Sequence, residues 1–332
     1  MLRMSVENTQ TAKIMSLVFW KSIWITMRPY LIFVSGASGL VGLAFIENPR
    51  AERIWMAFFP LFFSYGLGQA LTDCFQTDTD AISSPYRPMI KGVLSKRQVL
   101  SASLVGITLG ILILTYLNPW ILGLGILAVL GLLSYTTFKR TWWAGPFWNS
   151  WIVALLPIIG RAVERDFLIR ELVNVKNPQS RAFLFAVSAI FFAYGNFVVM
   201  GYLKDINADR KTGYQTFPVV FGWRATAIYS DVLAFAAALF TCLALFSIDK
   251  LSLLGISIFA VALSINLYAQ IKIHHTQDER EAFGPIVNVV RSLILYCVAI
   301  IISQKGEWLV IVAVFYLLFE VALKYRPEKT QV

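Results

Sequence analysis

The sequence is poor in charged residues and in the side chains that usually build zinc sites or disulfide frameworks. Only 14% of its 332 residues are charged, and the chain holds three cysteines and two histidines. Cys74, Cys242 and Cys297 show no CxxC or related spacing, so neither a zinc site nor a disulfide framework is indicated. His274 and His275 are adjacent and point to different faces of a helix, which makes them weak candidates for a catalytic or ligand role.

The first 20 residues also lack the basic, apolar and small-residue order of a signal peptide. We expect residues 1–20 to form a cytoplasmic lead-in that is either amphipathic or flexible. No linker long or polar enough to separate domains follows it. Residues 21–326 are therefore expected to form one membrane domain.

Apolar residues, by contrast, are in large excess. They make up 58% of the chain, and the mean hydropathy is +0.66, whereas a soluble domain is typically about 45–50% apolar. Several runs reach the roughly 20 residues needed to cross a bilayer as a helix. The runs are continuous, and barrel strands would instead alternate apolar and polar residues. The sequence predicts an all-α, polytopic membrane bundle.

We expect nine, or with the less regular segments ten, transmembrane helices. The short fifth segment and the last two leave the number open. The predicted spans are residues 29–46, 54–72, 98–117, 119–136, 147–161, 181–201, 225–247, 251–271, 285–303 and 307–324.

Basic residues concentrate in alternate loops between these spans. They are Arg87, Lys91, Lys96, Arg97, Lys139, Arg140, Lys204, Arg210, Lys211, Arg224, Lys272 and Arg280. Excess Lys and Arg marks the cytoplasmic side of a membrane protein, so we expect these loops to face the cytoplasm of a bacterial-type inner or cell membrane. Topology then accounts for most of the net charge of +10. No nucleic-acid-binding motif accompanies it, and no nucleic-acid partner is expected.

Aspartates do not follow from topology, and they cluster in two places. The segment "GQALTDCFQTDTDAISSPYRPMIKG", residues 68–92, places Asp73, Asp78 and Asp80 directly after an apolar helix. On a continuing helix, Asp73 and Asp80 lie two turns apart on nearly one line with Gln76 between them. Asp78 points elsewhere.

The second cluster is "GYLKDINADRKTGYQTFPVVFG", residues 201–222, which ends another apolar helix on the same expected membrane face. Asp205 and Asp209 are four residues apart, about one helical turn. Carboxylates so close repel one another unless a cation neutralises them. Paired hard oxygen ligands suit Mg²⁺, which takes one or two carboxylates and completes its shell with water and phosphate oxygens.

Basic side chains are interleaved with these acids. Arg87, Lys91, Lys204, Arg210 and Lys211 would suit a diphosphate held through Mg²⁺. The pattern indicates a site for a lipid diphosphate, with its tail in the bundle and its head group at the interface. From the residues alone, structural salt bridges at interfacial helix ends account for the pattern equally well.

Both segments resemble the signatures of the UbiA superfamily of intramembrane prenyltransferases. "TDCFQTDTDAISSPYRPMIKG" resembles the first signature, NDxxDxxxD followed by PxRP, and "KDINADRKTGYQTFPVVFG" resembles the second, DxxxD. "RPY" at residues 28–30 and "YTTFK" at residues 135–139 resemble two weaker family elements, RPH and YxxxK. The resemblance spans nearly the whole chain in order and spacing.

The resemblance implies a bundle of nine helices around a central cavity open to lipid, with Mg²⁺ as cofactor. Asp73, Asp80, Asp205 and Asp209 match the metal-binding aspartates. Arg87 matches the arginine of PxRP, and Tyr135 and Lys139 match residues near the diphosphate and the allylic cation. Thr72 and Gln76 stand where the family has Asn and Asp. Thr72 offers a hydroxyl beside the diphosphate, and Gln76 and Asp78 offer further oxygen atoms to a metal.

The expected function is Mg²⁺-dependent ionisation of an isoprenyl diphosphate, of geranyl length or longer, and transfer of the prenyl group to an aromatic or other hydrophobic acceptor. The acceptor is not identified by the sequence, and the other partner is membrane lipid. A terpene cyclase that uses the diphosphate alone remains open because of Thr72 and Gln76. An ion-coupled transporter or lipid-binding protein is a third reading of the same acids.

Overall fold

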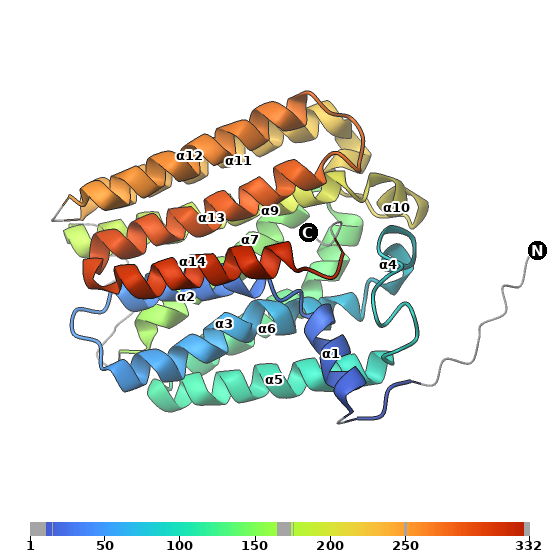
Figure 1. The fold of residues 1–332 in the computed structure, drawn as a ribbon, viewed down its shortest axis with the longest axis horizontal. Coiled ribbons are helices and arrows are strands. Elements are labelled where there is room, and N and C mark those ends of the chain that lie inside the picture. The colour runs from blue at the N-terminus through green and yellow to red at the C-terminus, as the bar shows by residue number, and fades with distance from the viewer. Residues whose placement is uncertain (1–10, 15, 165–173, 175, 249–250, 329–332) are drawn as a thin grey trace, which may run out of the picture.

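The computed structural model describes residues 11–14, 16–164, 174, 176–248 and 251–328, and the described part contains helices and no strands. Part of the predicted lead-in, residues 1–10 and 15, lies outside it, as do four charged residues between the fifth and sixth predicted spans, Arg165, Asp166, Arg170 and Glu171. Figure 1 shows the helices running side by side along the length of the molecule. The elements are α1 (Leu17–Thr26), α2 (Ile32–Ala44), α3 (Ala51–Asp73), α4 (Thr77–Ser83), α5 (Lys96–Leu117), α6 (Ile121–Thr141), α7 (Gly145–Ala162), α9 (Pro178–Leu203), α10 (Ile206–Lys211), α11 (Phe217–Ser247), α12 (Leu253–His274), α13 (Phe283–Gln304), the 3-10 turn η1 (Gly306–Trp308) and α14 (Leu309–Lys324).

Each predicted span coincides with one of these helices, so the all-α, multi-pass bundle is confirmed. Eight helices of the described chain are long and apolar enough to cross a membrane, fewer than the nine or ten expected. The difference arises at two places. α2 has only 13 residues, and α7 carries the polar residues Asn149, Ser150 and Arg161 within its 18.

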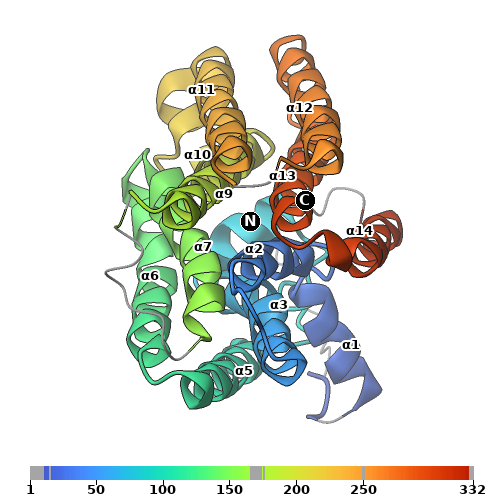
Figure 2. The same cartoon turned by 90° about the vertical axis from the view of Figure 1, so that its left-hand side faces the viewer.

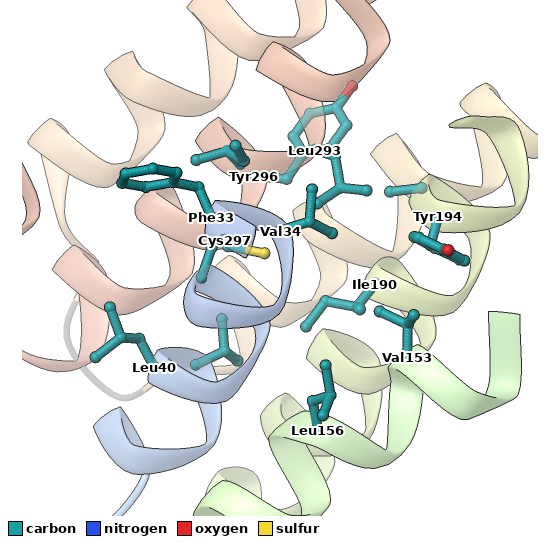
Figure 3. Close-up of a cluster of buried hydrophobic side chains, with 14 of the residues drawn as sticks. Phe33, Val34, Leu40, Val153, Leu156, Ile190, Tyr194, Leu293, Tyr296 and Cys297 are labelled. Carbon is teal, nitrogen blue, oxygen red and sulfur yellow. The ribbon is translucent and has the colours of Figure 1, made fainter. Parts of the chain in front are cut away.

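α2 occupies the centre of the bundle, and all of its residues are buried. In the end-on view of Figure 2, α2 is surrounded by α3, α7, α9 and α13. Figure 3 shows Phe33 and Val34 of α2 among Val153 of α7, Ile190 of α9 and Leu293 of α13. A short helix buried on every side carries no charged face, and the hydroxyls of its two polar residues, Ser35 and Ser38, donate to backbone carbonyls.

Close contact between α2 and α7 depends on glycine. A Cβ atom at Gly42 would lie 2.0 Å from the carbonyl oxygen of Pro157, and one at Gly160 would lie 2.5 Å from that of Gly39. Small residues let helix backbones approach each other in membrane proteins, where dispersion contacts drive helix association. These glycines therefore fix the distance between the central helix and its neighbour.

Uncharged polar side chains join α9, α11, α12 and α13 inside the bundle. Ser230 donates to Asn196 at 2.5 Å and to Gln270 at 2.9 Å. Gln270 donates to Asn266 at 3.0 Å, and Asn266 donates to the hydroxyl of Tyr296 at 3.4 Å. Interhelical hydrogen bonds of this kind stabilise membrane bundles by about 0.6 kcal/mol each on average. They hold together the four helices behind the polar end of the molecule.

Two short helices form that polar end. α4 follows α3 and α10 follows α9, and both lie at the same end of the bundle (Figure 1). The side chains of Thr79 and Thr212 join them through a hydrogen bond of 2.9 Å. The two aspartate segments, 125 or more residues apart in sequence, are thereby neighbours.

We predict that Gly42→Ala lowers the melting temperature of the detergent-purified protein by several degrees. The added methyl group overlaps the Pro157 carbonyl, and overpacking of this kind costs about 1–3 kcal/mol. Gly123→Ala in α6 is the matched control, because nothing lies within 4 Å of its added Cβ and alanine favours a helix. Differential scanning fluorimetry measures both. Equal melting temperatures for the two variants would refute the close-packing account.

Candidate active site

The first pair of carboxylates is assembled by a turn. α3 ends at Asp73, and α4 begins at Thr77 after a short connection. The helix does not continue from Asp73 to Asp80, so the alignment of the two aspartates that a continuing helix would give is not formed. The turn nevertheless brings both carboxylates to one guanidinium. Arg87 Nη1 lies 3.1 Å from Asp73 Oδ1 and closer still to Asp80 Oδ2.

Arg28 is a site residue that the sequence reasoning did not assign. Its Nη2 donates to Asp73 Oδ1 at 2.8 Å, and its Nη1 donates to Gln69. Its backbone has φ = 53°, a left-handed conformation that is uncommon for residues other than glycine. The only sequence signal was "RPY", whose proline follows Arg28 directly. A strained backbone held by two side-chain contacts is typical of a functional position.

The second pair is also built at a helix break. α9 ends at Leu203, and Asp205 precedes the first residue of α10 with non-helical backbone angles. The two acids therefore do not share one continuous α9 helix. Lys204 Nζ lies 3.9 Å from Asp205 Oδ2. Asp209 is completely buried in α10 and accepts a hydrogen bond of 3.1 Å from Thr216.

Lys139 connects the two acidic segments. From the last turn of α6, its Nζ donates to Gln76 Oε1 at 3.2 Å and lies 3.7 Å from Asp209 Oδ1. The Gln76 amide in turn donates to the Thr136 hydroxyl at 3.3 Å. Tyr135 lies one turn before Lys139, and its hydroxyl is 3.0 Å from that of Tyr202. α6 thus supplies the cation that links α4 to α10.

These side chains surround a cavity of about 90 Å³ at the polar end of the bundle. Its polar lining is formed by Asp73, Asp80, Asp205, Arg28, Arg87, Lys139, Lys204, Gln69, Gln76, Thr79, Asn149, Tyr65, Tyr135, Tyr194 and Tyr202. Eight of these were predicted from the sequence as site residues. Asp209 lies behind the lining, in contact with Lys139.

The other predicted residues lie outside the cavity. Asp78 is exposed and pairs with Arg140 at 2.8 Å, which agrees with its expected separate direction. Thr72 is buried, and its hydroxyl donates to the backbone carbonyl of Gln69 at 3.0 Å. The remaining predicted basic residues, Lys91, Arg210 and Lys211, are exposed. The structure does not bring these side chains to the cavity, and their roles in diphosphate binding stay predictions.

Burial raises the pKa of two carboxylates on the short helices α4 and α10. It raises the pKa of Asp80 to about 6, although the nearby Arg87 opposes the shift. It likewise raises the pKa of Asp209 to about 6, against the opposing charge of Lys139. Burial lowers the pKa of Lys204, with the attraction of Asp205 opposing. Shifts of this size indicate carboxylates that gain from a nearby cation.

The donor set fits Mg²⁺. It consists of carboxylate and amide oxygens, the hard ligands that Mg²⁺ prefers. Asp209 Oδ1 is buried and accepts no hydrogen bond from any described residue. Its contact is the Lys139 ammonium at 3.7 Å, which a metal cation would replace. Asp73 and Asp80 already approach one shared positive group. No cluster of three or more His, Cys, Asp or Glu side chains that could hold a metal ion occurs among the described residues.

Comparison with known proteins agrees with this geometry. The UbiA prenyltransferase family matches residues 30–288, and the chain belongs to that family. Digeranylgeranylglyceryl phosphate synthase from Pyrococcus abyssi is 24% identical over 210 residues, 62% of this chain and 71% of the relative. 2-Acylphloroglucinol 4-prenyltransferase from Humulus lupulus is 27% identical over 214 residues, 60% of this chain and 50% of the relative.

Solved structures share the fold. A UbiA homologue from Archaeoglobus fulgidus, bound to GPP and Mg²⁺, superposes with a TM-score of 0.60 at 15% identity, covering 84% of this chain and 99% of the homologue. The predictions of family membership and of a prenyltransferase enzyme are thereby confirmed. The particular substrates of this chain are a separate question.

We predict that Arg87→Gln lowers the melting temperature without Mg²⁺ and increases the stabilisation that added Mg²⁺ produces. Removal of the guanidinium leaves the buried Asp80 carboxylate without its ion pair and leaves Asp73 with Arg28 alone. A cation can then replace the lost charge. Arg97→Gln, at an exposed residue of the same region, is the control. Scanning fluorimetry with and without Mg²⁺ measures both shifts. A Mg²⁺ response no larger than that of the wild type would contradict the shared-cation arrangement.

Proposed function

We propose that the protein binds an isoprenyl diphosphate with Mg²⁺ at the polar end of the bundle and transfers its prenyl group to a hydrophobic acceptor. The observation that carries this proposal is the convergence of two acidic segments from separate helices, with Arg28, Arg87, Lys139 and Lys204, on one cavity. Structural salt bridges alone would not require a cavity between them.

The ion pairs support an assignment of residues to the metal and to the diphosphate. Asp73, Asp80, Asp205 and Asp209 would hold Mg²⁺, and Gln76 supplies a further carbonyl oxygen. Bound Mg²⁺ supplies positive charge that favours departure of the diphosphate. Since Arg87 contacts two of the carboxylates directly, binding of the metal and diphosphate requires Arg87 to exchange these contacts for phosphate oxygens.

The residues that line the cavity support the following course of the proposed reaction. The bond between C1 of the prenyl chain and the diphosphate oxygen breaks, and its electron pair leaves with the diphosphate. Arg28, Arg87 and Lys204 stabilise the charge that develops there. Tyr135 and Tyr202 line the same cavity, and their aromatic rings would stabilise an allylic cation. The acceptor atom bonds to C1 and releases its proton to water at the polar end.

The position of the cavity in the bundle bears on the side of the membrane that it faces. The molecule is a multi-pass membrane protein by its apolar helices and its family. The cavity lies where α3, α6 and α9 end and α7 begins, at the bundle end whose loops carry the excess of Lys and Arg. We propose that this end faces the cytoplasm, following the positive-inside pattern.

The acceptor class is suggested by the relatives. One relative is named for a glyceryl phosphate product and another for an acylphloroglucinol, which is an aromatic acceptor. Both names describe transfer to a second molecule. We therefore prefer transfer over cyclisation for this chain.

We predict that Asp73→Asn and Asp209→Asn each reduce Mg²⁺-dependent diphosphate release by at least about 100-fold, since each removes a buried ligand whose loss removes transition-state stabilisation of about 3 kcal/mol. Asp78→Asn is the matched control, because Asp78 is exposed and lies outside the cavity. Release is measured in liposomes with geranyl, farnesyl and geranylgeranyl diphosphate. Undiminished turnover in either cavity variant would eliminate the metal-site assignment.

The same assay separates the alternative functions when it is run with and without a membrane lipid extract. A prenylated product that needs the extract supports transfer. A cyclic hydrocarbon formed without the extract supports a terpene cyclase. Solute flux across liposomes without diphosphate consumption supports a transporter.

A further inference from the structure

Three buried polar atoms beside the candidate active site have no hydrogen-bond partner in the described part of the chain. They are Tyr30 Oη, Tyr86 Oη and Arg87 Nε. Buried polar groups in folded proteins are nearly always paired, and an unpaired hydroxyl destabilises the fold relative to an apolar group of the same shape. Each of the three atoms carries a hydrogen that it can donate. The group that they lack is therefore an acceptor.

The three atoms come from two segments that meet at the site. Tyr86 directly precedes Arg87, and Tyr30 follows Arg28 by two residues. The guanidinium groups of Arg28 and Arg87 meet on one carboxylate oxygen, Asp73 Oδ1, at 2.8 and 3.1 Å. The segments "RPY" and "PYRP" thus bring their unpaired donors to the same part of the bundle.

The charges around these donors favour an anionic acceptor. Burial lowers the pKa of Arg326, whereas the nearby Tyr30 and Tyr86 raise it, so both rings lie close to a further guanidinium. Hydrogen bonds to a charged oxygen are roughly twice as strong as those between neutral groups. A phosphate group has several such oxygens, and it can accept from all three donors at once. Phosphate chemistry therefore fits this set of unpaired atoms.

Arg87 can contact the acids and a phosphate with different edges of its guanidinium. Its Nη1 alone contacts Asp73 and Asp80, and its Nε–H has no acceptor among the described residues. Arginine holds its five N–H donors in a fixed planar fork, so the edge that carries Nε suits an oxyanion. The three donor atoms are buried. The movement of Arg87 toward phosphate oxygens, which the proposed reaction requires, would open a path to them.

We propose that the hydroxyls of Tyr30 and Tyr86 and the Nε–H of Arg87 together bind the terminal phosphate of the prenyl diphosphate. The inference rests on the proposed function and adds two tyrosines to its diphosphate site. Negative charge collects on the diphosphate as it departs, which strengthens hydrogen bonds that are already directed at its oxygens. The two hydroxyls therefore support both binding and departure of the diphosphate.

Tyr229 on α11 offers a matched control. Its hydroxyl is also buried and unpaired among the described residues. Its ring lies beside those of Phe147 and Phe217, with centroid distances of 6.0 and 4.6 Å. Tyr229→Phe therefore removes an unpaired hydroxyl from an aromatic cluster. It should relieve the same destabilisation without removing a contact to phosphate.

The binding test is isothermal calorimetry of the full chain in dodecyl maltoside, with Mg²⁺ and inorganic diphosphate. We expect Tyr30→Phe/Tyr86→Phe to weaken diphosphate binding at least about tenfold, because one hydrogen bond to a charged group typically contributes a factor of about ten or more. Each single variant should weaken it less, and Tyr229→Phe should bind as the wild type does. Without diphosphate, every variant should melt at or above the wild-type temperature, since an unpaired buried hydroxyl is removed.

Unchanged diphosphate affinity in the double variant would overturn the inference. A melting temperature lowered by several degrees, with unchanged affinity, would show that structural water pairs the hydroxyls and would overturn it as well. Free inorganic phosphate is another source of the same oxyanion chemistry. If the double variant loses affinity for inorganic phosphate and keeps its affinity for diphosphate, the assignment to the diphosphate is wrong.

Turnover of geranylgeranyl diphosphate separates this inference from the proposed function. If both hold, its KM rises at least about tenfold in the double variant and stays unchanged in Tyr229→Phe. If Asp209→Asn abolishes diphosphate release while the double variant keeps the wild-type KM, the proposed function stands and the inference is wrong. If the wild type releases no diphosphate, a tenfold loss of inorganic diphosphate binding in the double variant still supports the tyrosine site.

Discussion

The contact of the Lys139 ammonium with Gln76 and Asp209 is the interaction on which the polar end of the molecule depends. Lys139 is buried near the end of α6, and an isolated charge buried in this way would cost several kcal/mol. The Asp209 carboxylate and the Gln76 carbonyl compensate for it from two different short helices. Any arrangement that separates α4 from α10 would leave these groups unpaired. The requirement to neutralise one lysine thus helps to assemble the candidate site from three distant parts of the chain.

The same requirement explains why each carboxylate of the site lies beside a cation. Arg87 is shared by Asp73 and Asp80, whereas Asp205 has Lys204 beside it. Each pair places a positive charge beside a carboxylate at the polar end of the bundle. They also occupy the oxygen atoms that a metal would use. Binding of Mg²⁺ with a diphosphate is then an exchange of partners, in which the basic side chains move from carboxylate to phosphate. Stability without substrate and affinity for substrate therefore depend on the same residues.

Much of this arrangement is predictable from sequence, because apolar run length and acid clustering are local properties. All ten predicted spans are helices, and the two acidic segments do meet. The predicted spans end at residues 72 and 201, close to the ends of α3 and α9, but the separate short helices α4 and α10 were not predicted. Arg28 was missed for a different reason. Its pairing with Asp73 joins residues 45 positions apart, and "RPY" by itself does not reveal a partner. Tertiary contacts of this kind leave little local trace.

The departure at Gln76 from the family signature has an electrostatic explanation in this site. An aspartate there would add another carboxylate to the cavity, and Lys139, its nearest cation, is already opposite Asp209. The amide keeps the carbonyl oxygen on Lys139 and adds no negative charge, and its N–H group donates to Thr136. Because one lysine balances one carboxylate, we infer that glutamine preserves neutrality at the junction of α4, α6 and α10. The remaining acids then carry the charge that a metal requires.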